Sequence, residues 1–340
     1  MIPLDSLKTL LGRALAARTS LIDPEHNTAF RLFAGFYEGC PDLVADIYGT
    51  NLILYGYGNS VEESRNLMLS VQGYLLESLP WVKCVIQKIR DSNQTTLRRG
   101  DVTYGDQAIH QVSEYGIWYA VDLLLSQDAS FYLDTRNLRQ WLFRNASGWS
   151  VLNLFAYTGS LGVSALAGNA SQVVQVDRNS IHLQFGQRSC ELNHLNPEKM
   201  SLVANDFFPS VANLKRSAEL FDAVIVDPPY FSKTPKGVID LVSKSQQVIN
   251  KIRPLVKDGG MIIAINNALF LKGADYWASL EQLCQDGYLS IETILPVPPD
   301  ITGYPETVVN QPPVDPTPFN HPTKIVLLKV KRKIWSLDPV

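Results

Sequence analysis

Val151-Leu-Asn-Leu-Phe-Ala-Tyr-Thr-Gly-Ser-Leu-Gly162 is the stretch of sequence that decides the predicted fold. It begins as an apolar run of strand length, passes through a polar turn, and continues into small and apolar residues at helical spacing. This order predicts a strand, a tight turn and a helix. Because Gly159 and Gly162 have no side chains, backbone N–H groups at the start of the helix can approach a ligand. We therefore expect a cofactor site, although a glycine turn that serves only packing gives the same pattern.

From Trp149 onward, strand-like and helix-like segments alternate along the chain. Strands joined by connections of helix length are typical of a doubly wound, mostly parallel sheet, which binds ligands at the carboxyl ends of its strands. We therefore predict an α/β fold with a doubly wound, Rossmann-like sheet. The predicted strands are 150–155, 172–176, 200–204, 223–226, 261–265, 289–296 and 324–330.

The N-terminal part of the chain has a different pattern. Leucines and alanines at helical spacing predict one amphipathic helix, and short β-like runs separated by turn residues predict a smaller α+β domain with an antiparallel sheet. We predict three parts: an N-terminal helix (1–26), a central α+β domain (27–125) and the domain with the doubly wound sheet (126–340). The predicted N-terminal elements are a helix at 3–20, strands at 29–33, 43–47 and 51–55, a helix at 61–79, a strand at 82–88 and a hairpin at 109–125.

Composition excludes several classes of protein. Of 340 residues 46% are hydrophobic, which is enough for two cores. No apolar run approaches the roughly 20 residues that span a bilayer, and no signal sequence is apparent, so we expect a soluble, cytoplasmic protein. The four cysteines lie far apart, so neither a disulfide framework nor a zinc site is expected. The net charge of −3 gives no general attraction to nucleic acid, which would need a local basic surface.

Acidic residues follow the second and third strands predicted for the doubly wound sheet. Asp177 follows the second strand, where a carboxylate can accept hydrogen bonds from a ribose diol. Asp206 follows the third and can accept from an adenine amino group while Phe207 packs on the ring; alternatively, Asp206 caps a helix and Phe207 belongs to the core. The turn at 156–162 lacks the first glycine of the G-x-G-x-x-G motif that suits a pyrophosphate, which favours a smaller zwitterionic cofactor over NAD.

A turn with two prolines ends the fourth predicted strand and is the most specific motif in the chain. The prolines fix an extended backbone and direct a carboxylate toward the strand ends, while the tyrosine after them can stack on a planar base. Two asparagines end the fifth strand, where their amides can bond a base edge or cap the next segment. The predicted catalytic set is Asp227, Pro228, Pro229, Tyr230, Asn266 and Asn267.

Together these motifs resemble the class I S-adenosylmethionine-dependent methyltransferases, and more narrowly the bacterial 23S ribosomal RNA methyltransferases of the cytosine-C5 and guanine-N7 types. The resemblance runs from about residue 27 to the end of the chain and also includes segments 29–32, 42–46, 114–116 and 131–136. It implies an enzyme that uses S-adenosylmethionine as its cofactor and RNA, with 23S rRNA favoured, as its partner. Neither a metal ion nor a membrane is expected to take part. It also implies cofactor contacts from Asp134 and Arg136, from Asn153, Phe155, Tyr157, Thr158 and Gly159 at the methionine end, from Asp177 at the ribose, and from Asp206 and Phe207 at the adenine.

Two departures from the family pattern concern the substrate. The cytosine-C5 members start with an RNA-binding domain of the PUA type, whereas this sequence starts with the helix after it, so RNA contact is expected from 27–120. Methylation at pyrimidine C5 needs a thiolate that adds to C6; the C5 members supply it after the fifth strand, where this chain has Asn266 and Asn267. We therefore favour guanine N7 or an exocyclic amine, which need alignment without a covalent intermediate, over cytosine C5. An NAD(P)-dependent oxidoreductase and a non-catalytic RNA-binding assembly factor remain as alternatives.

Overall fold

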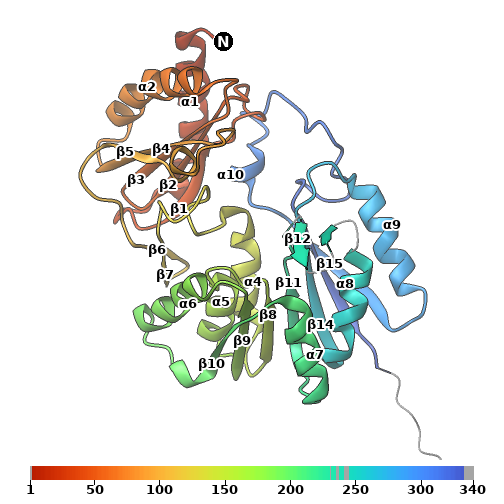
Figure 1. Ribbon diagram of the computed structural model, residues 1–340. Coiled ribbons are helices and arrows are strands. Elements are labelled where there is room, and N and C mark those ends of the chain that lie inside the picture. Colours follow the sequence, from red (N-terminus) through yellow and green to blue (C-terminus); the bar gives the residue numbers. More distant parts are fainter. Residues whose placement is uncertain (1, 230, 235–236, 241–244, 333–340) are drawn as a thin grey trace, which may run out of the picture. The chain divides into compact units, whose positions relative to one another are not determined.

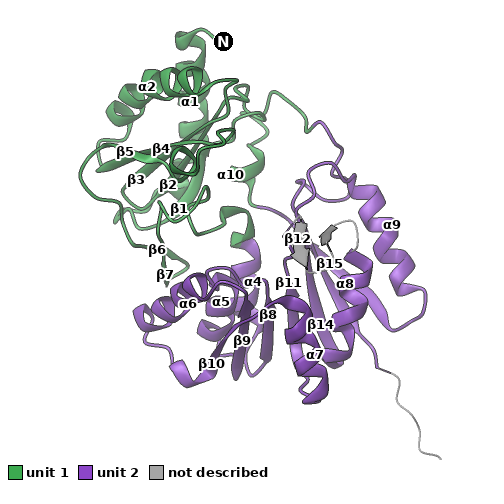
Figure 2. Cartoon of the chain, viewed as in Figure 1, with its two compact units in different colours: residues 1–136, 298–312 green, residues 137–297, 313–340 purple. Residues whose placement is uncertain are grey.

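Two compact units make up the chain (Figures 1 and 2). The structure is a computed structural model that describes residues 2–229, 231–234, 237–240 and 245–332. The first unit comprises residues 1–136 and 298–312, and the second comprises 137–297 and 313–340. The predicted parts 1–26 and 27–125 both lie within the first unit, and residues 298–312 return to it from the C-terminal part of the chain.

The first unit is built on a five-stranded sheet of order β1-β2-β3-β4-β5. Its neighbouring strands pair antiparallel except β3 and β4, which are parallel. A parallel pair requires a crossover connection, and the helix α2 (Val61–Ser78) supplies it. The strands predicted to form an antiparallel sheet, 29–33, 43–47 and 51–55, do pair antiparallel, and the parallel pairing of β3 with β4 makes the complete five-stranded sheet mixed. Its strands are β1 (Ala29–Phe33), β2 (Leu43–Tyr48), β3 (Asn51–Gly56), β4 (Cys84–Ile89) and β5 (Asp101–Tyr104).

The N-terminal helix α1 (Leu4–Ala17) belongs to the core of the first unit. Leu7, Leu11 and Ala14 are spaced to lie on one face of the helix, and all three are buried. They share a hydrophobic cluster with Met68 and Val71 of α2 and with residues of the sheet. The helix is thus a structural part of this unit and not an appendage to it.

A hairpin and short helical segments complete the first unit. Its strands β6 (Gln111–Glu114) and β7 (Ile117–Ala120) are joined by Tyr115 and Gly116, which both have positive φ. Such a turn matches the twist of paired strands, and the predicted hairpin is confirmed. The remaining elements are the 3-10 helices η1 (Thr19–Leu21) and η2 (Leu133–Thr135) and the short α-helices α3 (Thr95–Arg99) and α10 (Pro299–Thr302).

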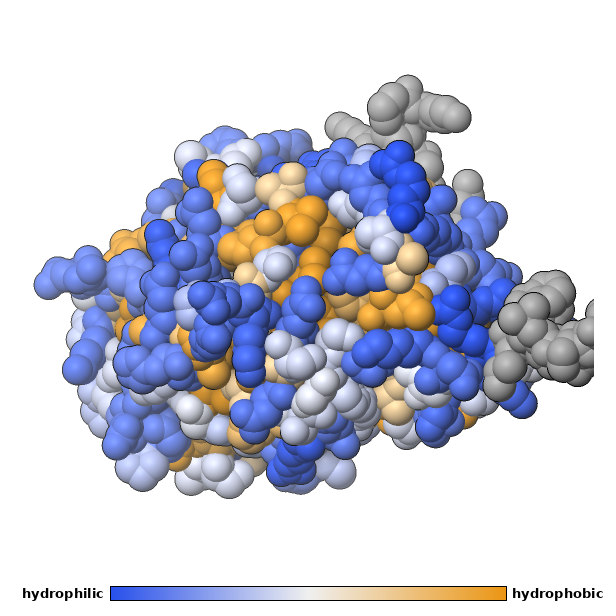
Figure 3. Space-filling view, turned by 90° about the horizontal axis from the view of Figure 1, so that it is seen from below, coloured by the Kyte–Doolittle hydropathy of each residue, from blue (hydrophilic) through white to orange (hydrophobic). Residues whose placement is uncertain are grey.

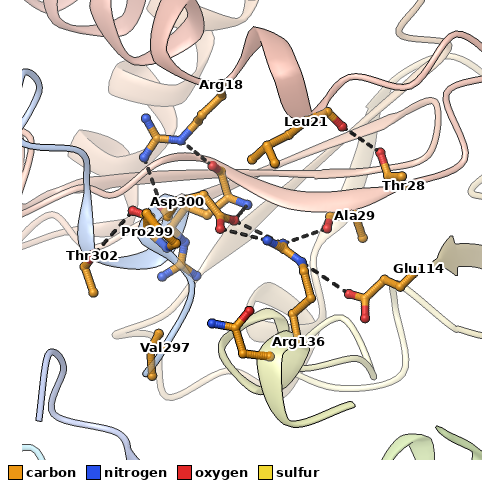
Figure 4. Close-up of polar contacts among 12 residues, drawn as sticks. Arg18, Leu21, Thr28, Ala29, Glu114, Arg136, Val297, Pro299, Asp300 and Thr302 are labelled. Carbon is orange, nitrogen blue, oxygen red and sulfur yellow. Dashed lines mark hydrogen bonds and ion pairs between the residues drawn. The ribbon is translucent and has the colours of Figure 1, made fainter. Parts of the chain in front are cut away.

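Asp300 of α10 fastens segment 298–312 to the rest of the first unit (Figure 4). Its carboxylate accepts hydrogen bonds from Nη1 (2.8 Å) and Nη2 (3.1 Å) of Arg136 and from the backbone N–H of Arg31 (2.9 Å). Its backbone carbonyl accepts one from Nη2 of Arg18 (2.9 Å). Burial alone would lower the pKa of Arg136, but the carboxylates of Asp300 and Glu114 outweigh that effect and raise it. The network is therefore a buried set of paired charges.

The second unit contains a seven-stranded sheet of order β10-β9-β8-β11-β14-β16-β15. The first five strands in this order pair parallel, and β16 pairs antiparallel with both β14 and β15. The order reverses between β8 and β11, which is the switch point where ligands bind in doubly wound sheets. The predicted fold is confirmed. The strands are β8 (Ser150–Leu154), β9 (Gln172–Asp177), β10 (Met200–Ala204), β11 (Phe221–Val226), β14 (Val256–Asn266), β15 (Leu289–Leu295) and β16 (Lys324–Val330).

Helices cover both faces of this sheet. Val211, Ile249 and Leu280, one from each of α7, α8 and α9, pack on alternate strand residues of one face. Figure 1 shows these three helices beside the sheet. Helices α5 and α6 pack on β8, β9 and β10. The elements are α4 (Arg136–Asn145), α5 (Ser160–Ala167), α6 (Ser180–Leu192), η3 (Pro197–Lys199), α7 (Phe207–Arg216), α8 (Ser245–Ile252), η4 (Arg253–Leu255), α9 (Gly273–Cys284) and the hairpin β12 (Phe231–Thr234) with β13 (Gly237–Asp240).

The surface is mostly hydrophilic on the face drawn in Figure 3, where a hydrophobic area interrupts the polar residues. Within the described ranges, no helix combines the length and the apolar character needed to cross a bilayer.

Candidate functional site

The carboxyl ends of five adjacent parallel strands gather most of the predicted site residues along one edge of the second sheet. In spatial order, Asp206 follows β10, Asp177 ends β9, the turn 155–159 follows β8, Asp227 follows β11, and Asn266 ends β14. Residues from distant parts of the sequence therefore share one edge, as predicted. Tyr230 lies outside the described residues.

Asp177 is fixed by the backbone around it. One carboxylate oxygen accepts the N–H of Tyr157 (3.0 Å), and the other accepts the N–H of Asn179 (2.8 Å). Asp177 therefore joins the turn after β8 to the start of α6. A carboxylate offers about four lone-pair positions, so the two bonds leave acceptor capacity for ribose hydroxyls.

The turn after β8 is held in a strained conformation. Phe155 (φ 59°) and Tyr157 (φ 51°) are left-handed, which is uncommon for residues with a β-carbon. Backbone bonds keep the turn in place, from the N–H of Ala156 to Val176 (2.9 Å) and from the N–H of Gly159 to Ala156 (2.8 Å). Local strain of this kind is concentrated at functional sites.

Gln175 explains why the turn needs glycine. It is fully buried on β9, accepts from Nδ2 of Asn153 (2.8 Å) and donates to the carbonyl of Gly159 (3.0 Å). A β-carbon on Gly159 or Gly162 would lie 2.5 or 2.6 Å from the Gln175 amide. The missing side chains thus make room for a buried polar support beneath the turn. Asn153 is 1% exposed and belongs to this support; its predicted cofactor contact stays a prediction.

Asp206 and Phe207 begin α7 with different surroundings. Asp206 is exposed at the N-cap position, and among the described residues its side chain makes no capping hydrogen bond. Phe207 is buried in the core cluster and stacks on Phe155, with ring centroids 5.0 Å apart. The core position considered for Phe207 is therefore observed, whereas the adenine contacts of both residues stay predictions.

The two asparagines at the end of β14 have different partners. Asn267 donates from Nδ2 to Oδ1 of Asp227 (2.8 Å), which joins the ends of two adjacent strands. Asn266 is 1% exposed and accepts the backbone N–H of Ala268 (3.0 Å) through Oδ1, so it caps the following turn. Pro228 is buried and Pro229 is exposed. Asn267 therefore orients the Asp227 carboxylate, and Asn266 shapes the turn beside it.

Lys324 lies next to this strand end and was missed by sequence reasoning. It pairs with Asn266 in the β14–β16 ladder and is fully buried. Its Nζ donates to the carbonyls of Ala268 (3.0 Å) and Pro322 (2.6 Å). Burial lowers the pKa of Lys324 to about 8. A lysine at the start of a strand normally indicates an exposed end, so nothing in the sequence pointed to this role.

His182, beside the turn at 155–159, is a second residue that the sequence did not single out. Its ring lies edge-on to Tyr157, with centroids 4.7 Å apart, and its Nε2 is 3.1 Å from Nδ2 of Asn179. Burial lowers the pKa of His182, and Asp177 partly opposes that shift. His182 therefore supports Tyr157 from α6.

Asp134 and Arg136 belong to the first unit. Asp134 is half-buried in η2, and the Arg136 guanidinium binds Asp300, Glu114 and the carbonyl of Ala29 (Figure 4). The structure thus gives Arg136 a structural role. The cofactor contacts predicted for these two residues stay predictions.

All four cysteines fall within the described part of the chain, and none follows the carboxyl end of a strand in the seven-stranded sheet. Burial raises the pKa of every one of these thiols, to about 11 for Cys40 and about 12 for Cys190. A raised pKa favours the protonated thiol at neutral pH and so disfavours a nucleophilic role for these cysteines. The described ranges also hold no group of three or more His, Cys, Asp or Glu residues suited to a metal ion.

Comparisons with known proteins agree with this geometry. The ribosomal RNA large subunit methyltransferase I of Erwinia tasmaniensis is 28% identical over 272 residues, covering 78% of this chain and 67% of that protein. The protein of the same name from Escherichia coli O127:H6 is 29% identical over 263 residues, or 75% and 65% of the two chains. The chain thus spans about two thirds of the length of these relatives.

A solved structure and a family model match the chain as well. The crystal structure of SMU.776 complexed with SAH superimposes with a TM-score of 0.84 at 24% identity, covering 97% of this chain and 82% of that one. The family described as S-adenosylmethionine-dependent methyltransferase matches residues 102–299, more than half of the chain. This chain therefore belongs to the S-adenosylmethionine-dependent methyltransferases and is an enzyme that uses S-adenosylmethionine as its cofactor.

Proposed function

We propose that this methyltransferase modifies a base of ribosomal RNA, with 23S rRNA as the favoured substrate. The methyl group is transferred to guanine N7 or to an exocyclic amine, without a covalent intermediate between enzyme and base. Two curated relatives are named as large-subunit ribosomal RNA methyltransferases, which supports RNA as the substrate class. Membership of the methyltransferase family removes the reason to consider an NAD(P)-dependent oxidoreductase.

The residues at the strand ends fit the cofactor. Asp177 is a fixed carboxylate with acceptor capacity for the ribose hydroxyls, and the strained turn at 155–159 lies directly beside it. We assign the methionine end to this turn, including Tyr157 and Thr158, and the adenine amino group to the exposed carboxylate of Asp206. When bound, S-adenosylmethionine supplies an electrophilic methyl group.

The hydrogen bond from Asn267 to Asp227 carries the proposed chemistry. It holds a carboxylate in one orientation at the end of β11, next to the strand whose turn is assigned to the cofactor. A fixed carboxylate can accept an N–H bond from a base and so align a nitrogen nucleophile. A nitrogen brings its own lone pair, so alignment and electrostatics are sufficient.

The cysteines argue against methylation at cytosine C5. That reaction requires a thiolate that adds to C6 of the pyrimidine. Cys40 and Cys84 lie in the first unit, Cys190 is buried in α6, and Cys284 ends α9. Burial raises the pKa of all four thiols, which opposes formation of a thiolate.

We also propose that residues 27–125, which belong to the first unit, recognise the RNA. Of the arginines in segment 90–99, Arg90 is paired with Asp128 (2.9 Å), whereas Arg99 is exposed at the end of α3. Arg90 is therefore occupied within the protein. Arg99 is the better candidate for a phosphate contact.

Replacement of Asp227 tests the proposed function. Purified enzyme is incubated with S-adenosylmethionine carrying a labelled methyl group and with rRNA from cells that lack the gene. We expect Asp227→Ala to abolish transfer to RNA while binding of S-adenosylhomocysteine, measured by calorimetry, is retained. Asp275→Ala, at an exposed aspartate of α9, serves as the control with normal transfer. Full activity of Asp227→Ala would refute the assignment, and a wild-type protein that binds this RNA without any transfer would refute the proposed substrate.

A further inference from the structure

The turn between β14 and α9 exposes two large apolar side chains in succession. Leu269 is 66% exposed and Phe270 is 57% exposed. Within the ranges that the structure describes, no other exposed large hydrophobic residues are adjacent in sequence. Scattered apolar residues are ordinary on a protein surface, but neighbouring ones beside a functional site indicate a contact surface.

The start of this turn is firmly anchored. Ala268 is completely buried. Its N–H donates a hydrogen bond to Oδ1 of Asn266 (3.0 Å), and its carbonyl accepts one from Nζ of Lys324 (3.0 Å). The ammonium group of Lys324 thus fixes the residue that precedes the exposed pair. Because Lys324 is the first residue of β16, its bond to Ala268 ties the turn to that strand, and a second bond from Nζ to the carbonyl of Pro322 (2.6 Å) holds the ammonium group in place.

The end of the turn is anchored too. The N–H of Gly273, the first residue of α9, bonds the carbonyl of Asp315 (2.9 Å). A β-carbon at Gly273 would collide with the carbonyl of Pro316, so the two backbones are in close contact. The exposed pair therefore lies on a turn that is held at both ends and is preorganised for contact.

The exposed pair is next to the proposed catalytic carboxylate. Asn267, two residues before Leu269, donates the hydrogen bond that orients Asp227. The turn that carries the exposed pair therefore begins at the strand end that holds this carboxylate. RNA bases combine a planar apolar face with a polar edge, and a base must leave its stack before an enzyme can act on it. Stacking on an aromatic side chain offsets part of that cost.

We propose that Leu269 and Phe270 form an apolar platform for an unstacked base of the RNA substrate, with Phe270 as the stacking ring. This inference rests on the proposed function. It adds a specificity-determining contact outside the cofactor turn and the Asp227 motif, on a segment held in place by Lys324.

The test compares Phe270→Ala, Phe270→Leu and Phe270→Trp with wild type in steady-state methyl transfer to naked rRNA. Base stacking is worth about 1–3 kcal/mol, so Phe270→Ala should lower kcat/KM for RNA by roughly 5- to 150-fold. Phe270→Leu should be similarly impaired because it keeps apolar bulk without a ring, and Phe270→Trp should retain activity. Leu69→Ala, at a 56% exposed leucine of α2, should match wild type.

Binding of S-adenosylhomocysteine separates the contact from a structural role. All Phe270 variants should bind it with wild-type affinity, and a loss of that affinity would overturn the proposal. Equal kcat/KM for Phe270→Ala and wild type would also overturn the proposal. A defect of Phe270→Ala on ribosomal particles but not on naked RNA would overturn it too, because that result would indicate that the side chain contacts a protein. Absence of transfer by the wild-type enzyme would overturn both this inference and the proposed function, and so is distinguishable from a failure confined to the variants.

Discussion

Replacement of Asp300 by alanine should severely destabilise the first unit. Asp300 is 1% exposed, and its carboxylate accepts from Nη1 (2.8 Å) and Nη2 (3.1 Å) of Arg136 and from the N–H of Arg31 (2.9 Å). The Arg136 side chain is only 10% exposed, and the other carboxylate near it, that of Glu114, is more distant at 3.5 Å. The substitution therefore leaves a buried guanidinium with a weak ion pair.

Removing one partner of a buried ion pair costs about 3–5 kcal/mol, because the remaining charge stays desolvated. A domain is typically stable by about 5–15 kcal/mol, so the loss is a large fraction of the total. Asp300→Asn should cost less, since the amide oxygen still accepts a hydrogen bond and the volume is preserved.

Hydrogen exchange followed by mass spectrometry measures this loss within the first unit, at the amides of β1 to β4. The control is Asp286→Ala, which breaks an ion pair with Arg253 of the same length (2.8 Å) in which Asp286 is 43% exposed. Exposed pairs contribute about 0–1 kcal/mol. If Asp300→Ala destabilises the protein no more than Asp286→Ala does, the reasoning about the buried network is wrong.

Four further predictions concern the cofactor site, the cysteines and Lys324. Gly159→Ala should weaken binding of S-adenosylhomocysteine roughly tenfold in calorimetry, because φ is 77° there and Gln175 occupies the space of a β-carbon; unchanged affinity would contradict this. Asp177→Asn should weaken binding of S-adenosylhomocysteine by roughly 10- to 150-fold. The two oxygens of Asp177 each accept a hydrogen bond from a backbone N–H, and an amide has only one oxygen to do so. A smaller change would argue against the ribose assignment. Each of the four single Cys→Ser variants that still folds should retain methyl transfer to RNA, and loss of transfer in a folded variant would point to a thiol nucleophile. Lys324→Met should remove a pH dependence of stability. The pKa of Lys324 is about 8 in the folded protein and 10.5 in the unfolded chain, so the unfolded chain binds more protons between these values. As pH rises from 8 to 10.5, the free energy of unfolding of wild type should therefore increase by up to about 3 kcal/mol relative to the variant. A constant difference in denaturant unfolding across that range would count against it.

The inner strands of the second sheet were predictable because they are apolar runs followed by polar turns. Burial on both faces requires such runs, and each predicted strand of the sheet is observed. The hairpin was also predictable, since Tyr115-Gly116 supplies the positive φ values that its turn requires. Asp177, Asp206 and Asp227 could be placed at one edge because the carboxyl ends of parallel strands meet there.

Interactions between residues distant in sequence could not be predicted. Asp300 bonds Arg136, which lies 164 positions earlier, and no local pattern indicates that residues 298–312 return to the first unit. Gln175 appears in the sequence as one polar residue within an apolar strand, and its role depends on Asn153 and the glycines brought against it. Lys324 is buried only because the turn after β14 supplies carbonyls for its ammonium group. Such positions are set by tertiary packing.

Identification of the methylated nucleoside tests the central claim most directly. Ribosomal RNA from cells lacking the gene is treated with the purified enzyme and S-adenosylmethionine, digested to nucleosides and analysed by mass spectrometry. We predict a new 7-methylguanosine or a nucleoside methylated on its exocyclic amine, formed by wild type and absent with Asp227→Ala. New 5-methylcytidine, or no new methylated nucleoside at all, would contradict the proposal that Asp227 and Asn267 align a base nitrogen without help from a thiol.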